Sequence, residues 1–340
     1  MYPIDFVIPW VDGSDPKWLS EKRKYQSSDN GSSTFSDANG DCRYRDNGFL
    51  KYWFRGVEAF APWVNHVFFI TCDQHPKWLN TKHPKLICIN HKDYIPDIFL
   101  PTFNANTIEM NLHRIHGLSE HFVYFNDDMF LVKPISEDFF FREGKPVLDT
   151  KIIYPPSDSI HNFERLLFND FKLVNSTFNP VSSVLSNNDK WFNISALGLK
   201  RVLANLLLFI VVRKLPVSTY GHLALPHLKS TFKEVWEHHS VLLSESSSYK
   251  FRSDSQVNQW LLCAWNQAKG TFYPTHRNRI GSCFIYNDDN LKAIKEFIEL
   301  LPTPLLCLNE TEIGGISDST TSCVSKEFDA LLPNKSSFEL

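Results

Sequence analysis

Asn126-Asp127-Asp128 closes the segment His121-Phe-Val-Tyr-Phe-Asn-Asp-Asp128, in which an apolar, aromatic run ends in two adjacent carboxylates. Such a run predicts a buried β-strand. Ligands bind at the carboxyl ends of strands in an open α/β sheet, so we expect both acids to face a crevice. Paired acids there suit Mg²⁺ or Mn²⁺, which take hard oxygen ligands and share their coordination shell with substrate phosphates. The alternative is a plain turn in which Asp127 caps a local backbone N–H.

A second apolar segment, Ile4-Asp-Phe-Val-Ile-Pro-Trp-Val11, also ends in acids, in the sequence Asp12-Gly-Ser-Asp15. Two strand ends of the same charge repel each other unless a cation lies between them or they face different ways. We expect Gly13 to adopt a positive φ and to bring the backbone close to whatever lies in front of the turn. The alternative is an ordinary Asp-Gly turn that precedes Pro16.

Length and composition limit the class of protein. A chain of 340 residues, 43% of them hydrophobic, can bury a large core, which excludes a disordered protein and predicts one extended α/β domain with insertions, or two lobes. The net charge of −3 and the lack of a long basic tract argue against nucleic acid as a partner. The seven cysteines include no Cys-x-x-Cys pair, which argues against a zinc site or a disulfide framework and fits a reducing cytoplasm.

Neither secretion nor a membrane span is predicted. Residues 1–5 lack the basic and apolar regions of a signal peptide. The longest apolar stretch, residues 202–212, is shorter than the roughly 20 residues that a spanning helix needs. Its flanks, Lys200-Arg201 and Arg213-Lys214, would suit a helix lying on an anionic membrane surface, but we interpret the stretch as a buried core helix.

Between the two acidic strand ends, the sequence predicts a loop followed by a helix. Residues 27–41 are rich in Ser, Asp, Asn and Gly and predict a loop, either an active-site lid or an inert surface excursion. Asp46 is expected to N-cap a helix whose apolar stripe lies within residues 49–60. Lys51 and Arg55 lie on another face of that helix, which is either solvated or in contact with an anion.

The following elements favour a mostly parallel sheet. Strands are predicted at residues 67–71 and 86–90. A helix from about 107 to 115 would carry Glu109 and His113 on one face, since they are four residues apart. Alternating strands and helices are typical of α/β proteins with a parallel sheet.

The C-terminal third supplies positive charge. Ser253 and Gln256 form a capping-box pattern ahead of an amphipathic helix, which would place Arg252 just before a helix N-terminus. Free N–H groups, the helix dipole and a guanidinium would together form a phosphate site. The alternative is an arginine paired with a surface carboxylate such as Asp254.

Two histidines, His222 and His227, flank a proline-stiffened loop. An unperturbed imidazole titrates near neutral pH, so either histidine could accept or donate a proton. A purely structural histidine is the alternative.

Several of these motifs resemble the Stealth family, which comprises bacterial capsular and exopolysaccharide phosphotransferases and the α/β subunit of the animal lysosomal-enzyme N-acetylglucosamine phosphotransferase. The segments that carry the resemblance are Ile4–Trp18, Arg45–Tyr52, Ala61–Val64, Ile108–Ile115 and Phe125–Phe130. The match covers most of residues 4–135, resumes at 221–260, and reappears weakly at 307–309 and 333–338. One departure is Phe49, where many members have an acid, which weakens any role for the start of that helix.

The resemblance implies one catalytic domain with a Rossmann-like (GT-A-like), mostly parallel sheet and a helical insertion or second lobe. Residues 1–135 would form the nucleotide- and metal-binding core, 136–218 a variable insertion, and 219–340 the part that completes the active site. The implied reaction transfers a hexose- or N-acetylhexosamine-1-phosphate from a UDP-sugar to a hydroxyl of an oligo- or polysaccharide, and releases UMP. Nucleotide sugars are cytoplasmic, so we expect a cytoplasmic enzyme, at the inner face of the membrane if partners or residues 202–212 hold it there.

The resemblance also assigns roles to residues. Asp127 and Asp128 would hold Mg²⁺ or Mn²⁺, and Arg252 would bind the transferred phosphate. His222 is our first choice for the general base and Glu109 the second. The substrate-binding residues that we expect are Asp12, Asp15, Arg45, Arg55, His113, Arg114 and His227.

Two rival functions remain open. A metal-dependent glycosyltransferase would attack the anomeric carbon and release UDP rather than UMP. A non-catalytic glycan-binding protein would retain the fold alone, and the full set of acids together with His222 and Arg252 argues against it.

Overall fold

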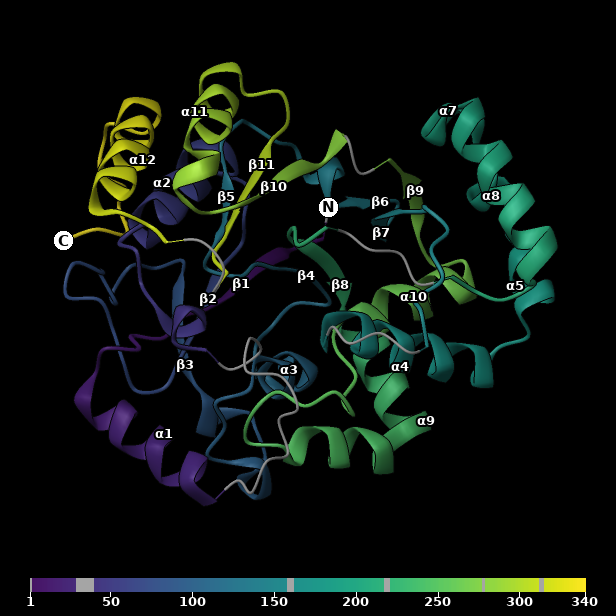
Figure 1. The fold of residues 1–340 in the computed structure, drawn as a ribbon, viewed down its shortest axis with the longest axis horizontal. Coiled ribbons are helices and arrows are strands. Elements are labelled where there is room, and N and C mark those ends of the chain that lie inside the picture. The colour runs from purple at the N-terminus through teal and green to yellow at the C-terminus, as the bar shows by residue number, and fades with distance from the viewer. Residues whose placement is uncertain (1, 29–39, 158–161, 217–220, 277–278, 312–314) are drawn as a thin grey trace.

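A five-stranded sheet forms the centre of the computed structural model, which describes residues 2–28, 40–157, 162–216, 221–276, 279–311 and 315–340 (Figure 1). Its strands are β1 (Ile4–Pro9), β2 (Val67–Thr71), β3 (Leu86–Asn90), β4 (His121–Tyr124) and β8 (Leu225–Leu228). They lie in the order β3-β2-β1-β4-β8, and only β8 is antiparallel to its neighbour. The predicted α/β class with a mostly parallel sheet is confirmed.

The strand order places a crevice beside the acidic strand ends. From β1 the chain moves outward through β2 to β3, and then crosses to the other side of β1 to form β4. Val7 of β1 pairs in parallel with Tyr124 of β4, so both strands end at the same edge of the sheet. A reversal of strand order of this kind opens a crevice at the carboxyl ends of the two strands.

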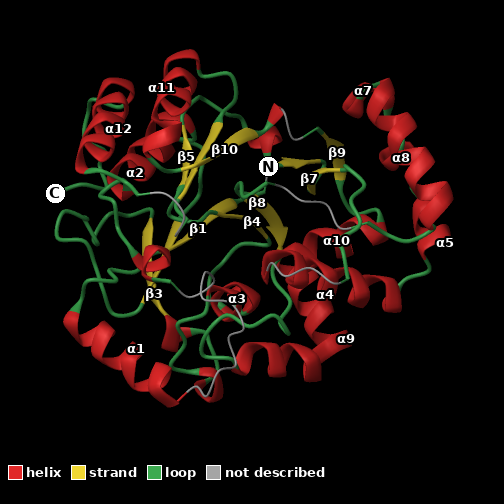
Figure 2. Cartoon of the chain, in the orientation of Figure 1, coloured by secondary structure: helices red, strands yellow, loops and turns green. Residues whose placement is uncertain are grey.

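Helices cover both faces of this sheet, as a buried parallel sheet requires (Figure 2). Phe6 and Ile8 point to one face and Val7 to the other, because side chains alternate along a strand. The first face shares one apolar cluster with α2 (Leu50–Phe60), and through it with α11 (Leu291–Leu300) and α12 (Asp318–Leu331). On the second face pack α3 (Ala105–Met110), α9 (Lys229–Ser248) and α10 (Trp260–Lys269).

Two small sheets pair C-terminal strands with earlier parts of the chain, and one of them lies at the acidic strand end. One consists of β10 (Gly281–Ile285), β11 (Leu305–Asn309) and β5 (Met129–Leu131), in that order. Because β5 begins directly after Asp128 and pairs antiparallel with β11, the end of β11 lies next to the acids. The other consists of β6 (Phe141–Arg142), β7 (Lys145–Asp149) and β9 (Tyr273–Thr275).

A helical section follows β7 in the chain, and its helices α5, α7 and α8 lie at one edge of the molecule (Figure 1). It comprises α4 (Asn162–Thr177), α5 (Pro180–Ser186), α6 (Asn188–Trp191), α7 (Ile194–Leu197) and α8 (Leu199–Val212). The remaining helix, α1 (Pro16–Ser28), lies near the N-terminus. The prediction of a buried core helix at residues 202–212 is wrong: Leu203 is 56% exposed, Leu207 65% and Val211 73%. None of the helices in the described ranges is long and apolar enough to cross a membrane.

Two predicted helix boundaries are also wrong. Asp46 does not cap α2, which begins four residues later at Leu50; its Oδ1 instead accepts a hydrogen bond from the backbone N–H of Gly48. The helix predicted for 107–115 ends at Met110 and continues only as a 3₁₀ turn from Leu112 to Arg114. Glu109 and His113 therefore do not share a helical face.

The turn after β1 differs from its prediction in conformation but not in effect. Gly13 does not adopt a positive φ. Its N–H donates to the Tyr44 carbonyl oxygen, and a Cβ at this position would lie 2.1 Å from that oxygen. The glycine is therefore needed for close backbone approach rather than for a left-handed conformation. Of the predicted loop at residues 27–41, the stretch 29–39 lies outside the described residues.

Candidate active site

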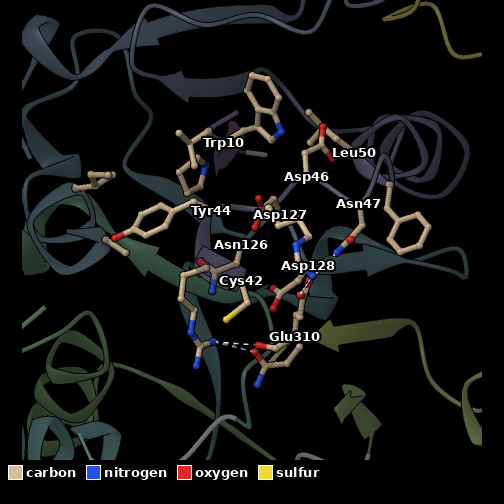
Figure 3. Close-up of a pocket in the computed structure, with 18 of the residues that line it drawn as sticks. Trp10, Cys42, Tyr44, Asp46, Asn47, Leu50, Asn126, Asp127, Asp128 and Glu310 are labelled. Atoms are coloured by element: carbon tan, nitrogen blue, oxygen red, sulfur yellow. Dashed lines mark hydrogen bonds and ion pairs between the residues drawn. The ribbon is translucent and has the colours of Figure 1, made fainter. Parts of the chain in front are cut away.

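A pocket lies at the crevice beside the ends of β1 and β4 (Figure 3). Several parts of the chain contribute to its wall, among them residues 9–11 at the end of β1, 42–47 and 49–50, four residues between 102 and 108, 126–128 after β4, and 308–310 at the end of β11. His222 and Arg252 line the same pocket. The structure thus brings together Asp127, Asp128, His222 and Arg252, which are far apart in the sequence.

The two acids after β4 lie in a strongly negative part of the pocket. Burial, together with the negative charges of the neighbouring Asp128 and Asp46 carboxylates, raises the pKa of Asp127 to about 7. Asp128 Oδ1 is buried and has no hydrogen-bond partner in the part of the chain that the structure describes. Carboxylates that are crowded together and partly unpaired would bind a divalent cation favourably, because the cation removes their mutual repulsion. These residues therefore fit such a cation.

His222 is held against Asp128. Its Nε2 lies 2.9 Å from Asp128 Oδ2 and 3.4 Å from Asn126 Nδ2. His222 has a φ of +54°, a left-handed conformation that is uncommon for residues other than glycine and is often found at functional sites. Burial alone would lower the pKa of His222, but the Asp128 carboxylate outweighs burial, so the net pKa is raised. With Nε2–H donating to an ionised Asp128, the Nδ1 lone pair is the one left to accept a proton.

Cys307 joins this pair. One ligand atom each from Asp128, His222 and Cys307 lies within 4.8 Å of the other two. Burial raises the pKa of the Cys307 thiol well above its ordinary value, and nearby Cys283 and Asp128 add to the shift. A protonated thiol is a poor ligand for a hard cation, so the carboxylates are better suited to Mg²⁺ than Cys307 is. No role for Cys307 is predicted from the sequence, although Cys307 lies in a segment that weakly resembles the Stealth family.

Glu109 lies behind the pocket wall rather than on it. The Tyr124 hydroxyl donates to its Oε1 at 3.1 Å, and the carboxyl group is buried. The pKa of Glu109 is raised to about 7, because burial outweighs the opposite effects of the Arg252 charge, the Tyr124 hydrogen bond and the His222 charge. Glu109 therefore interacts electrostatically with both His222 and Arg252 from the protein side.

Arg252 is positioned by a buried polar network rather than by a helix N-terminus. The next helix, α10, begins only at Trp260, so the predicted helix N-terminus after Arg252 is wrong, although the Ser253 backbone N–H does bond to the Gln256 side chain. Gln256 is buried, and its Oε1 accepts from Asn104 Nδ2, Asn106 Nδ2 and the Ser253 backbone N–H. Asn104 Nδ2 also donates to the carbonyl oxygen of Phe251. These bonds fix the backbone on both sides of Arg252, and no helix dipole contributes there.

Two acids on the pocket wall were not predicted as site residues. Asp46 lines the pocket, and burial raises its own pKa. Glu310 lies opposite, at the end of β11, where it forms an ion pair of 2.5 Å with Arg45 and accepts from Asn47 Nδ2. Arg45, a predicted substrate-binding residue, therefore lines the pocket with an acidic partner. The motif that contains Arg45 and Asp46 was a usable signal for Asp46, but Glu310 lies beyond any segment that suggested a role.

The acids of the turn after β1 are not among the residues that line the pocket. Asp12 Oδ1 accepts from the backbone N–H and the hydroxyl of Ser14, and its own backbone is held by the Gln74 side chain. Asp15 accepts from the Trp18 backbone N–H and so caps the start of α1. Both acids stabilise the local backbone.

Four basic residues predicted to bind substrate also lie outside the pocket lining. The buried Arg55 guanidinium forms two hydrogen bonds to the Glu339 carboxylate. Arg114 lies over the Trp236 ring, and His113 stacks on Phe232.

His227 Nε2 lies 2.9 Å from Gln259 Oε1, and burial lowers the pKa of His227 to about 4. Burial likewise lowers the pKa of His113 to about 3. Each of these side chains makes contacts within the fold, although Nδ1 of His113 and Nδ1 of His227 have no hydrogen-bond partner among the described residues.

Similarity to known proteins extends over the whole chain. Residues 2–29 match conserved region 1 (CR1) of the Stealth proteins, and residues 43–148 match conserved region 2 (CR2). The chain is 38% identical over 338 residues to the capsular polysaccharide phosphotransferase WcwK of Streptococcus pneumoniae, covering 99% of this chain and 98% of the relative. It is 37% identical to the receptor polysaccharide phosphotransferase WefC of Streptococcus gordonii, with 99% of each chain covered.

Two further matches are more distant. The exopolysaccharide phosphotransferase cps2G of Lactiplantibacillus plantarum is 34% identical, with 99% of this chain and 96% of the relative covered. Among solved structures, the galactosyltransferase LgtC in complex with donor and acceptor sugar analogues aligns at 10% identity and a TM-score of 0.40, covering 97% of this chain and 95% of that chain.

Proposed function

The chain belongs to the Stealth family of phosphotransferases, and we propose that it transfers a hexose- or N-acetylhexosamine-1-phosphate from a UDP-sugar to a hydroxyl of a capsular or exopolysaccharide glycan. Full-length relatives that are named as polysaccharide phosphotransferases support the class of reaction. The observation that carries the proposal is the convergence of Asp127, Asp128, His222 and Arg252 on one pocket. A nucleotide-sugar donor is met in the cytoplasm, so we propose that compartment for the reaction.

The proposed reaction breaks the bond between the two phosphates of the donor. The acceptor hydroxyl attacks the phosphorus that carries the sugar, the bridging P–O bond to the other phosphorus breaks, and UMP leaves. A phosphodiester joins the sugar to the acceptor. The hydroxyl proton passes to His222 Nδ1, because Asp128 occupies Nε2 at 2.9 Å. Asp128 thereby fixes the tautomer and stabilises the imidazolium that forms, as an acid does for a catalytic histidine.

A divalent cation, Mg²⁺ or Mn²⁺, would be held by Asp127 and Asp128. Bound there, it would supply positive charge to the phosphate oxygens of the donor. Its binding requires the ionised form of Asp127, whose pKa of about 7 reflects burial and repulsion in the absence of a cation. Asp128 Oδ1 is the carboxylate oxygen still available, since Oδ2 is engaged by His222.

Arg252 would bind the transferred phosphate. Its guanidinium is permanently charged and can bond two phosphate oxygens at once. Glu109, buried behind the wall, orients and balances this positive charge rather than reaching the substrate, so His222 is the better candidate for the base. Positive groups that face the phosphate where negative charge develops are the largest general contribution to catalysis of phosphoryl transfer.

The leaving nucleotide tests the proposal. Purified protein is incubated with Mg²⁺ and separately with UDP-glucose, UDP-galactose and UDP-N-acetylglucosamine, with and without an oligosaccharide acceptor. Chromatography then distinguishes UMP from UDP, and phosphorus NMR detects a phosphodiester in the product. UMP release with a new phosphodiester signal is the expected result. Release of UDP would contradict the proposal and favour a glycosyltransferase.

Metal dependence is measured in the same assay. Removal of divalent cations with EDTA should abolish UMP release, and Mg²⁺ or Mn²⁺ should restore it. Restoration by Zn²⁺ alone would instead point to the set of Asp128, His222 and Cys307, because thiolate and imidazole favour zinc. Full activity after EDTA treatment would exclude an essential cation.

A further inference from the structure

Helix α8 has two apolar faces, of which the fold covers only one. Val202, Asn205 and Phe209 are buried on its inner face. The outer face carries residues at spacings of three and four, all between 40% and 65% exposed: Leu199, Leu203, Leu206, Leu207 and Ile210. A soluble protein seldom exposes a continuous row of large apolar side chains unless another surface covers it.

The buried face fixes which side of α8 is exposed. Asn205 Nδ2 donates to the carbonyl oxygens of Thr150 and Trp191, and Asn205 Oδ1 accepts from the Ile152 backbone N–H. Turning the helix so that its leucines faced inward would leave the buried Thr150, Trp191 and Ile152 backbone groups without these hydrogen bonds, which is unfavourable. The leucine face is therefore exposed as a consequence of specific bonds.

The charge around this face is positive, although the chain as a whole is negative. No acidic residue occurs between Lys190 and Lys233, whereas the net charge of the chain is −3. Lys200 near the start of α8, and Arg213 and Lys214 just after its end, are exposed. The outer apolar row thus has exposed cations at both ends.

We propose that the outer face of α8 binds an anionic phospholipid membrane, with the helix axis parallel to the surface. Leucines would enter the boundary between headgroups and acyl chains, while Lys200, Arg213 and Lys214 would contact lipid phosphates. A helix of 14 residues is about 21 Å long, too short to span a bilayer but sufficient to lie in its interface. Figure 1 shows α8 at the edge of the molecule, where a flat surface could reach it.

A second copy of the chain fits this surface less well than a membrane does. If two α8 helices paired by two-fold symmetry, in either direction, the exposed cations of one copy would face those of the other. No acidic side chain occurs on either helix to balance them. An anionic lipid surface complements both the apolar row and the charge.

Flotation with vesicles tests this inference in the full chain. Wild-type protein is mixed with vesicles of phosphatidylcholine alone and of phosphatidylcholine with phosphatidylglycerol. Binding to the anionic vesicles is expected, and it should weaken with added salt. Leu203→Gln with Leu207→Gln should reduce that binding by roughly tenfold per substitution, because each leucine loses its favourable transfer from water.

A matched control shows whether vesicle binding depends on the outer face of α8 or on any exposed apolar side chain. Val241→Gln with Leu300→Gln also removes two exposed apolar side chains, on α9 and α11, and should leave vesicle binding unchanged. Circular dichroism and release of UMP from a soluble donor show whether each variant is folded, and lipid binding is measured whether or not the enzymatic proposal holds. Absence of binding to anionic vesicles would overturn the inference. So would a wild-type dimer that Leu203→Gln with Leu207→Gln converts to a monomer, since the partner would then be a second copy.

Discussion

The pocket and the outer face of α8 differ in how they depart from ordinary folding. Buried polar groups are normally hydrogen-bonded, and rows of large apolar side chains are normally buried. In the pocket, polar groups are buried without full pairing: Asp128 Oδ1 has no hydrogen-bond partner among the described residues, and burial beside like charges raises the pKa of Asp127. On α8, apolar groups such as Leu207 are left in water. Each arrangement costs stability when the protein is alone. Both proposed binding surfaces therefore contain side chains that lack the partners that folding alone could provide.

The cluster around Arg55 shows the opposite case. Arg55 and Glu339 are both buried and charged, but they pair in parallel through two hydrogen bonds, and the Leu332 carbonyl oxygen accepts a third. The Arg55 cluster and the pocket thus both contain buried charged groups. The charges of the Arg55 cluster are paired by hydrogen bonds, whereas Asp128 Oδ1 in the pocket has no such partner within the described ranges. A buried charge with all its partners within the fold supports structure, and one that lacks a partner is available to a ligand.

The largest effect is expected from Asp128→Asn, which removes the charge of the incompletely paired carboxylate in the pocket. The amide cannot provide the negative charge needed by a cation or by the His222 imidazolium. We expect UMP release to fall by roughly 10³-fold or more. Rates are measured at saturating donor and Mg²⁺, with thermal unfolding measured in parallel, and the melting temperature should not decrease, because one repelling carboxylate is removed.

Asp15→Asn is the matched control, since it makes the same chemical change outside the pocket. Asparagine caps a helix about as well as aspartate, so both α1 and activity should be retained. A second readout is the pKa of His222, measured by NMR on metal-free protein. Asp128 raises that pKa, so Asp128→Asn should lower it. Retained activity in Asp128→Asn, or an unchanged His222 pKa, would contradict the proposed pairing.

The second prediction contrasts two arginines. Arg252→Met should reduce UMP release by roughly a hundred- to a thousandfold with little change in unfolding free energy, because a positive group that faces the phosphate is lost. Arg55→Met should leave the turnover of folded protein nearly unchanged but lower the unfolding free energy by about 3–5 kcal/mol, because Glu339 remains buried without its partner. Urea denaturation and steady-state kinetics on both variants provide the test. The reverse pattern would show that the roles of the two arginines had been exchanged.

This contrast also marks what the sequence could and could not predict. The strands at 67–71 and 86–90, and the position of the acids after β4, could be predicted because each strand is a local run of apolar residues. Their neighbours in space are not local. Cys307 is brought next to Asp128 by β11, and Arg252 reaches the pocket through the network around Gln256. Nothing in composition distinguishes Arg55 from Arg252, because the partner that satisfies Arg55 is Glu339, 284 residues away.

The wrong prediction of a buried helix at residues 202–212 also arises because tertiary contacts cannot be read from a local sequence pattern. An apolar run of this length predicts burial from its composition, but the covered side is decided by Asn205, a polar residue inside the run. The sequence pattern showed apolarity and flanking cations, whereas only packing shows which face remains exposed. A similar limit applies to α3, which ends at Met110, earlier than the predicted bound. Local patterns therefore predict elements, and tertiary contacts decide which side chains remain available.

The smallest expected effect concerns Glu109, which is intermediate between the pocket acids and the Arg55 cluster, because Tyr124 partly satisfies it. Its folded-state pKa of about 7 exceeds the ordinary value of 4.5. Between these values the unfolded chain has already released the proton that the native state retains, so stability falls as pH rises. Glu109→Gln, which carries no titrating proton, should remove part of this fall, by up to about 3 kcal/mol at pH 8.

Urea denaturation of metal-free protein from pH 5 to pH 8 measures that slope. Asp127, with its own raised pKa, contributes a fall of the same sign, so the Glu109→Gln curve should be flatter than that of wild type but not level. Glu299→Gln, on the exposed side of α11, should leave the slope unchanged. If Glu109→Gln shows the wild-type slope, then Glu109 is ionised in the folded protein at all these pH values, and the charges of Arg252 and His222 satisfy it as fully as Glu339 satisfies Arg55. In that case Glu109 would be a structural residue, paired within the fold as Arg55 is, rather than part of the pocket's incompletely paired acids.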